Sequence, residues 1–168
     1  MSLRVAILTV SDGVAAGARE DRGGPACEEA LARSGIAHRV VSRAAIPDGV
    51  EEVARAVRAQ TDADGADLVV LTGGTGVSPR DRTPEGVRSV IEFEVPGLAE
   101  KMRSETSGGF PAAYLSRQVV GVCGKTLVVA LPGSPKGAAD CLAAILPVLP
   151  HAVALVRGER PEHPPASG

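Results

Sequence analysis

A glycine-rich loop in the middle of the chain has the residue types of an anion site. It follows the apolar run of residues 68–71 and consists of two threonines and three glycines: Thr72, Gly73, Gly74, Thr75 and Gly76. Such a run is typical of a buried strand, and glycines just beyond its carboxyl end let the backbone approach a ligand closely. Unblocked backbone N–H groups in such a loop can bind phosphate. Because Asp81 follows, between Arg80 and Arg82, the segment predicts a nucleotide or phosphate site.

The alternative is a tight turn that uses glycine only for its backbone dihedral angles. Three glycines, two threonines and the Arg-Asp-Arg order together favour the binding site. The loop is not a P-loop, because no Gly-Lys-Ser/Thr follows, and its glycine spacing differs from that of the Rossmann fingerprint. A helix is expected after it, over residues 84–93, with Thr83 as its N-cap and Pro84 at its first position.

A second strand-to-helix turn repeats this arrangement later in the chain. It joins the apolar residues 126–130 to a helix expected over residues 135–149. The turn has the sequence Pro132, Gly133, Ser134, Pro135, Lys136. The N-terminus of a helix carries partial positive charge and free N–H groups, which suit a phosphate. Ordinary capping by Ser134 is the alternative, but two such turns in one small chain favour binding.

Other polar residues also stand beside predicted element ends. Ser11 and Asp12 follow the first apolar run, at the kind of strand end where open α/β sheets bind ligands. An Asx turn that closes the strand is the alternative. Asp48 precedes a helix expected over residues 49–60, and Glu51 completes an aspartate version of the capping box. Capping alone is therefore a sufficient reason for Asp48.

The composition of the chain excludes several classes of protein. Its 168 residues suit one domain, and a formal net charge of −2 gives no field for a polyanion. With no Trp, one Tyr and two Phe, it lacks a base-stacking platform for single-stranded nucleic acid. No segment approaches the roughly 20 apolar residues that span a bilayer. The three cysteines form no CxxC pair, so we expect a reduced, cytoplasmic protein that binds neither nucleic acid nor membrane.

Strands alternate with helices along the chain, which predicts an α/β fold. We expect a three-layer α/β/α arrangement with a mostly parallel central sheet and an antiparallel hairpin at one edge, made of residues 119–123 and 126–130. Further elements are expected as a strand over residues 36–41 and helices over residues 25–32 and 98–107. Residues 1–157 are expected to form one domain, followed by a flexible tail over residues 158–168.

The glycine loop closely resembles the signature of the molybdopterin adenylyltransferase family, the MogA- and MoaB-like proteins. Residues 75–76 and 79–85 (PRDRTPE) fit this branch better than two related families that share a Thr-Gly-Gly loop. Leu-Ser-Arg at residues 115–117 and Pro-Gly-Ser-Pro at residues 132–135 match the family as well. The likeness covers about residues 3–156, which is nearly the whole chain.

The resemblance implies an enzyme of molybdenum cofactor biosynthesis that converts ATP and molybdopterin to adenylylated molybdopterin and pyrophosphate, with Mg²⁺ as cofactor. It implies that Asp48 and Asp81 are catalytic and bind the metal, as suits a hard cation. Substrate- and nucleotide-binding residues are implied at these positions: Ser11, Asp12, Thr72, Gly73, Gly74, Thr75, Gly76, Glu100, Ser116, Arg117, Pro132, Gly133, Ser134 and Lys136. The family forms homo-oligomers, either trimers or hexamers, and the molybdenum-insertion protein is a further candidate partner.

Other interpretations of the same residues stay open. Glu100 and Arg103 could equally form a solvated i,i+3 ion pair. The alternative function is a molybdopterin carrier or scaffold that has lost catalysis, although the presence of both aspartates argues against it. A nucleotide-binding domain with a tubulin-like loop is the third interpretation, but that loop is longer and richer in glycine.

Overall fold

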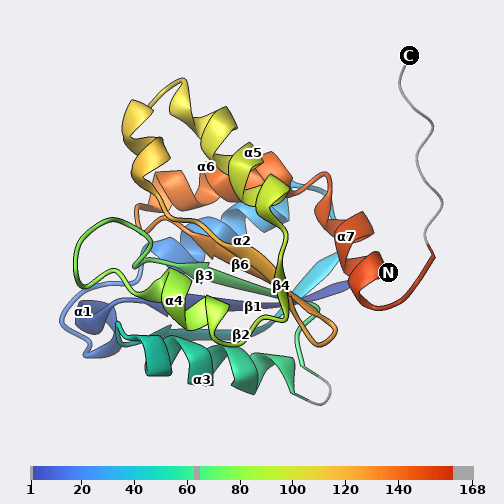
Figure 1. Ribbon diagram of the computed structural model, residues 1–168, viewed down its shortest axis with the longest axis horizontal. Coiled ribbons are helices and arrows are strands. Elements are labelled where there is room, and N and C mark those ends of the chain that lie inside the picture. The colour runs from blue at the N-terminus through green and yellow to red at the C-terminus, as the bar shows by residue number, and fades with distance from the viewer. Residues whose placement is uncertain (1, 63–64, 161–168) are drawn as a thin grey trace.

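A six-stranded sheet forms the centre of the molecule, with its strands in the order β2-β1-β3-β6-β5-β4 (Figure 1). The computed structural model describes residues 2–62 and 65–160, so residues 161–168 of the expected tail lie outside the described residues. The strands are β1 (Leu3–Val10), β2 (His38–Ile46), β3 (Leu68–Thr72), β4 (Phe93–Glu94), β5 (Val120–Cys123) and β6 (Thr126–Leu131). Adjacent strands from β2 to β6 are parallel, whereas β5 is antiparallel to both its neighbours. The prediction of a mostly parallel sheet with an antiparallel edge is confirmed.

Helices cover both faces of this sheet. One face carries α2 (Gly23–Arg33), α5 (Pro96–Ser107), α6 (Pro135–Ile145) and α7 (Leu149–Val156), and the other carries α3 (Val50–Thr61) and α4 (Thr83–Arg88). The short α1 (Asp12–Ala15) and the 3-10 helix η1 (Pro111–Leu115) lie in connections between larger elements. Figure 1 shows α3 on one side of the sheet and α5 and α6 on the other. The three-layer α/β/α architecture is therefore confirmed.

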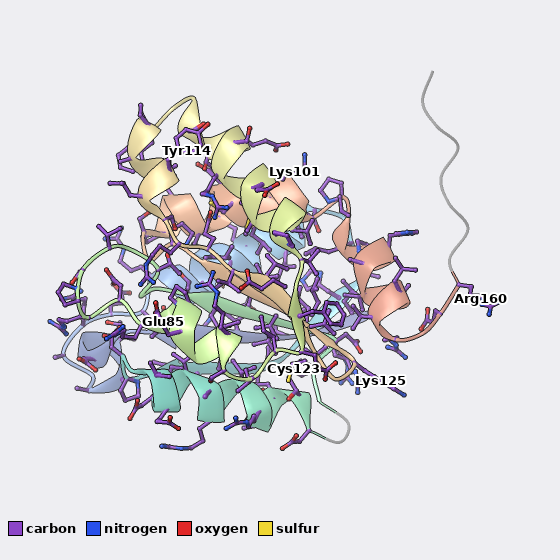
Figure 2. The ribbon with its side chains drawn as sticks, in the orientation of Figure 1. Glu85, Lys101, Tyr114, Cys123, Lys125 and Arg160 are labelled. Carbon is purple, nitrogen blue, oxygen red and sulfur yellow. The ribbon has the colours of Figure 1, made fainter. Side chains whose placement is uncertain are left out.

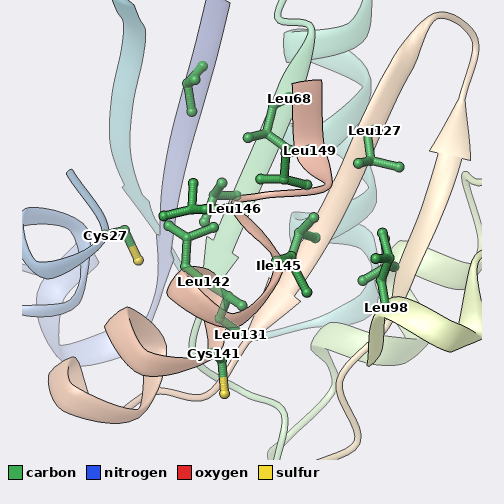
Figure 3. Close-up of a cluster of buried hydrophobic side chains, with 14 of the residues drawn as sticks. Cys27, Leu68, Leu98, Leu127, Leu131, Cys141, Leu142, Ile145, Leu146 and Leu149 are labelled. Carbon is green, nitrogen blue, oxygen red and sulfur yellow. The ribbon is translucent and has the colours of Figure 1, made fainter. Parts of the chain in front are cut away.

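The apolar runs form strands because both faces of the sheet are covered. All five residues of β3 are buried, and alternate residues face opposite layers. Leu68 and Val70 join the core beneath α2, α5, α6 and α7, part of which Figure 3 shows. Val69 and Leu71 join the core beneath α3 and α4. A continuous apolar sequence without polar alternation is the expected result.

Two of the three cysteines belong to the first core. Burial raises the pKa of Cys27 to about 12 and also raises the pKa of Cys141. Both thiols therefore stay protonated at neutral pH, and they pack as small apolar groups (Figure 3).

No single helix in the described chain is long and apolar enough to cross a membrane. The bent pair α6 and α7 passes that test only when joined. The buried residues of α6, together with Leu149 and Val153 of α7, lie in this core.

The segment after α4 differs from the sequence prediction. The helix expected over residues 84–93 ends at Arg88, and Phe93–Glu94 forms the edge strand β4. The backbone N–H groups of Glu92 and Val95 donate to carbonyl groups of β5 at 2.8 and 2.7 Å. This pairing with a distant strand outweighs the local helical pattern.

Two other boundaries also differ. The helix expected to reach residue 149 ends at Ile145, and α7 begins as a separate helix at Leu149. Pro147 stands in the break, and proline lacks the N–H group that would continue the first helix. The strand expected over residues 36–41 begins at His38 and extends to Ile46, because β2 pairs with β1 over this range apart from a bulge at Val41.

Asp67, just before β3, joins three distant parts of the chain. Its side chain is 2% exposed. Its carboxylate accepts hydrogen bonds from the backbone N–H of Arg4 at 2.8 Å, and from the guanidinium groups of Arg4 and Arg157 at 3.0 Å each. Burial by itself would raise the pKa of Asp67, but its hydrogen bonds with Arg4 and the charges of Arg4 and Arg157 hold that pKa below its ordinary value. This cluster fixes β1 and the C-terminal end of α7 to the start of β3.

Asp67→Asn is expected to lower the free energy of unfolding by about 2 kcal/mol at pH 7, because hydrogen bonds to a buried charge are lost. Because the folded pKa is lowered, this contribution is complete well above the ordinary value of 3.8 and disappears as the pH falls through the folded pKa. Urea unfolding across this pH range measures both effects. Asp62→Asn, at an exposed position after α3, should change the free energy by less than about 0.5 kcal/mol. Equal effects of the two substitutions would contradict the role of Asp67.

Candidate active site

A pocket lies at the carboxyl ends of β1, β3 and β6. Its volume is about 670 Å³, and its lining includes Ser11, Asp48, Thr72, Gly74 and Gly133. The chain leaves β1 toward α2 on one face and leaves β3 toward α4 on the other. Connections that leave neighbouring strands toward opposite faces create a crevice, which is the usual ligand site of an open α/β sheet. Predicted residues from four separate segments thus meet at one place.

The glycine loop turns sharply at the edge of this pocket. Gly73 and Gly74 have φ angles of 112° and 64°, which favour glycine. A Cβ atom on Gly73 would lie 2.3 Å from the carbonyl oxygen of Val10, and one on Gly74 would lie 2.4 Å from the hydroxyl oxygen of Thr83. Both the dihedral angles and the space therefore require glycine at these two positions.

Three consecutive backbone N–H groups of the loop have no hydrogen-bond acceptor in the described chain. The amides of Gly74, Thr75 and Gly76 donate to no acceptor within residues 2–62 and 65–160. The amide of Gly73 is different, since it donates to the carbonyl of Leu131 at 3.1 Å. Within the predicted loop, the amide of Gly73 therefore belongs to the turn itself, and only the three amides that follow it are left without a partner.

Thr83 fixes the far side of the loop rather than capping a helix. Its hydroxyl donates to the carbonyl of Gly73 at 2.7 Å, and its N–H donates to the carbonyl of Gly74 at 3.0 Å. The N-cap of α4 is Arg82, without a side-chain cap, so the prediction of Thr83 as the N-cap is wrong. The buried carbonyl groups of the loop need donors, and this need outweighs capping.

Arg117 holds the rest of the loop in place. Its guanidinium donates to the carbonyl oxygens of Gly76 at 2.8 Å and of Asp81 at 2.5 Å, and it forms an ion pair with Glu85. Its own N–H donates to the carbonyl of Thr75 at 2.7 Å. The hydrogen bond from Arg117 lowers the pKa of Glu85. Arg117 therefore stabilises the conformation of the glycine loop through its carbonyl groups.

Two hydroxyl groups complete the support of the loop. Thr72 donates from its hydroxyl to the carbonyl of Pro132 at 2.7 Å, which joins the two predicted turns. Thr75 is buried, and its hydroxyl lies 3.1 Å from that of Ser116. The loop, the Leu-Ser-Arg segment and the second turn are therefore one connected unit.

Three carboxylates line a smaller pocket of about 280 Å³ beside the first one. They belong to Asp12, Asp48 and Asp81. Asp48 accepts a hydrogen bond from the N–H of Asp12, and Asp12 accepts one from the N–H of Asp48, both at 3.0 Å. The N-cap of α3 is Gly49, without a side-chain cap, so the prediction of Asp48 as a helix cap is wrong. Its carboxylate is committed instead to the loop after β1.

These carboxylates fit a hard divalent cation. One oxygen of Asp48 binds the N–H of Asp12, and one oxygen of Asp81 binds the N–H of Ser78 at 2.9 Å. The second oxygen of each, Oδ1, accepts no hydrogen bond from the described chain. Among the described residues, no group of three His, Cys, Asp or Glu side chains is arranged to hold a metal ion by itself. A cation here would thus take further oxygens from a ligand, as Mg²⁺ commonly does.

A second large pocket, of about 490 Å³, opens on the other side of the turn after β6. Its lining includes Ser116, Pro132, Ser134, Lys136 and Phe110. Ser134 is the N-cap of α6, which was the alternative interpretation of this turn, and its hydroxyl accepts a hydrogen bond from the N–H of Gly137 at 3.1 Å. Pockets on both sides of one turn could hold two parts of a substrate, or two substrates.

Three further side chains need to be located, one that was predicted and two that were not. Glu100 is exposed on α5 and is not among the residues that line either large pocket of the described chain. Arg19 and Arg22, in the loop before α2, line the pocket at the strand ends. Neither arginine was predicted, because no local sequence pattern shows where a long side chain in a loop will lie.

The fold is that of a known family. The model of the family described as a probable molybdopterin binding domain matches residues 6–151. Because this match covers most of the chain, the protein belongs to that family. The resemblance found in the sequence is therefore confirmed.

Individual relatives agree with this assignment. A protein of Helicobacter pylori named molybdopterin adenylyltransferase is 34% identical over 157 residues, which cover 94% of this chain and 89% of that protein. The structure of the molybdopterin biosynthesis enzyme MoaB from Thermus thermophilus has a TM-score of 0.87 at 48% identity, and covers 94% of this chain and 98% of that one. The molybdopterin biosynthesis Mog protein of Mycobacterium ulcerans has a TM-score of 0.83 at 36% identity, with coverage of 92% and 99%.

Arg117→Lys is expected to loosen the loop, because a lysine cannot replace a guanidinium that contacts two carbonyl groups and a carboxylate. Hydrogen exchange of the backbone amides of residues 76–83 should become about tenfold faster, as the loss of a charged hydrogen bond worth about 1.5 kcal/mol implies. Exchange measured by mass spectrometry on peptides from this segment tests the change. Arg88→Lys, at a more exposed ion pair with Glu94, is the control and should leave the exchange unaltered. Unchanged exchange in the Arg117 variant would show that the loop does not depend on this side chain.

Proposed function

We propose that this protein is a molybdopterin adenylyltransferase that works in molybdenum cofactor biosynthesis. It joins the adenylyl group of ATP to molybdopterin and releases pyrophosphate. The strongest support is the position of three free loop amides beside a pocket of three carboxylates. Free amides suit phosphate oxygens, and carboxylates suit the cation that accompanies a nucleotide. The names of the relatives support the same activity.

In this proposal the phosphates of ATP bind the amides of Gly74, Thr75 and Gly76. Asp48 and Asp81 hold Mg²⁺, which neutralises negative charge on the phosphates when it is bound. An oxygen of molybdopterin forms a bond to the α-phosphorus of ATP while the bond from that phosphorus to pyrophosphate breaks. Catalysis of this kind depends on positioning and charge neutralisation, and a loop fixed by Arg117 and Thr83 supplies the positioning.

The second large pocket is the proposed site of molybdopterin. Phe110 and Ala113 offer apolar surface to a pterin ring, and Ser116, Ser134 and Lys136 offer polar groups. Isothermal titration with ATP, with and without Mg²⁺, tests the proposed function without a supply of the pterin. We expect binding that depends on Mg²⁺. A protein that binds molybdopterin but not ATP would instead be the carrier considered above.

The proposed setting is the cytoplasm, where the protein forms a homo-oligomer built on trimers, as a trimer or hexamer. The molybdenum-insertion protein is the proposed partner that receives the product. Large apolar side chains at the surface support the oligomer: Phe93, Phe110, Tyr114 and Leu115 are 58–65% exposed. Tyr114 lies on η1 at the edge of the molecule in Figure 2. Exposed apolar groups of this size are typical of interaction surfaces.

Asp81→Asn is expected to lower the rate of adenylyl transfer on the order of 100-fold or more, because asparagine lacks the charge that a hard cation requires. The fold should survive, since the asparagine carbonyl can still accept the hydrogen bond from Ser78. Asp48→Asn should behave in the same way, and Asp62→Asn is the matched control at an exposed position. Pyrophosphate release and molybdopterin binding are measured for each variant. A near wild-type rate in the Asp81 variant would show that the metal assignment is wrong.

Light scattering at micromolar protein concentration tests the proposed oligomer. We expect a mass equal to three or six copies of the 17.0 kDa chain. Burial of the exposed apolar side chains between subunits would account for that association. A monodisperse monomer would contradict the proposal.

A further inference from the structure

Arg19 lies where the two pockets of the nucleotide site meet. Three residues line both the large pocket at the strand ends and the carboxylate pocket, namely Ser11, Arg19 and Asp48. Of these three, Arg19 alone carries a positive charge. A ligand that extends from the loop amides to the carboxylates would therefore pass beside its guanidinium.

The loop that carries Arg19 is fixed at both ends. At its start, the N–H of Arg19 donates to the carbonyl of Gly13 at 3.0 Å. The guanidinium folds back over the same residue, since a Cβ atom on Gly13 would lie 3.5 Å from Nε of Arg19. At its end, Asp21 accepts hydrogen bonds from the hydroxyl of Thr9 at 2.9 Å and from the N–H of Gly24 at 3.0 Å. The backbone that presents Arg19 is thus positioned before any ligand binds.

Arg19 has no ion-pair partner in the described chain, whereas Arg80, the other arginine that lines the carboxylate pocket, has one. Arg80 forms an ion pair with Asp12 at 3.0 Å. Arg19 forms no ion pair with any residue of the described chain, although three carboxylates line the same pocket. A guanidinium beside free amides and left without a carboxylate partner is suited to phosphate, which it can bind through two parallel N–H groups.

We propose that Arg19 is a phosphate-binding residue of this site and contacts the polyphosphate of the nucleotide between the loop amides and the carboxylates. This inference rests on the proposed function. The partner chemistry is that of a di- or triphosphate, because a single phosphate on the loop amides would not need to extend across both pockets. Arg19 thereby adds positive charge where the carboxylates alone would repel the ligand in the absence of a cation.

Binding of inorganic pyrophosphate and of ATP, each with Mg²⁺, tests this role by isothermal titration. Arg19→Ala should weaken both ligands about tenfold, which is the loss expected for a charged hydrogen bond. Arg19→Lys should retain part of the affinity, because it keeps the charge but not the fork of donors. The control is Arg43→Ala. Arg43 is an exposed residue of β2 that pairs with Glu28 of α2, away from the site, so this variant should bind both ligands as the wild type does. Melting temperatures of all variants should agree, since Arg19 is exposed.

The outcomes separate this inference from the proposed function. If wild type and Arg19→Ala bind both ligands equally, the role of Arg19 is refuted while the nucleotide site stands. If the wild type binds neither pyrophosphate nor ATP, both proposals are refuted. In the transfer reaction, the Arg19→Ala variant should raise KM for ATP and leave KM for molybdopterin unchanged. Equal changes in both KM values would point to a general disturbance of the site and contradict the proposal.

Discussion

The glycine loop passes between two fixed groups, the carbonyl of Val10 at the end of β1 and the hydroxyl of Thr83 at the start of α4. Any side chain at Gly73 or Gly74 would collide with one of them, at 2.3 or 2.4 Å. The positive φ angles at these glycines lead the chain out of the sheet, and the next three amides donate to no group of the described chain. The binding capacity of the site thus follows from a steric constraint on the backbone.

Such free amides are useful only if the loop keeps its shape without a ligand. The loop carbonyl groups receive hydrogen bonds from Thr83 and Arg117, whereas the amides of residues 74–76 donate to no acceptor in the described chain. Beside the loop, the reciprocal hydrogen bonds between Asp12 and Asp48 fix one carboxylate while leaving Oδ1 of Asp48 free. Carbonyl groups that are already hydrogen-bonded hold the loop in shape, while its unpaired amides and Oδ1 of Asp48 stay free. The site is therefore organised before its ligand arrives.

The sequence predicts the strands and their ends well, because β1, β3 and β6 are largely apolar runs that are followed by Ser11, Gly73 and Pro132, respectively. It therefore also predicts that the candidate residues gather at one edge of the sheet. It fails where a side chain has two possible uses. Local spacing predicted that Asp48 and Thr83 cap helices. Their hydrogen-bond partners are instead Asp12 and Gly73, which lie 36 and 10 residues away in the sequence. Strand β4 was missed for the same reason, since its partner β5 lies later in the chain.

Transfer of a radioactive label from ATP to molybdopterin tests the central claim most directly. Two reactions are compared, one with ATP labelled at the α-phosphorus and one with ATP labelled at the γ-phosphorus. Adenylyl transfer predicts that the α-label appears on the pterin and that the γ-label appears in pyrophosphate. A pterin that carries the γ-label, or neither label, would contradict the account of this site as an adenylyltransferase.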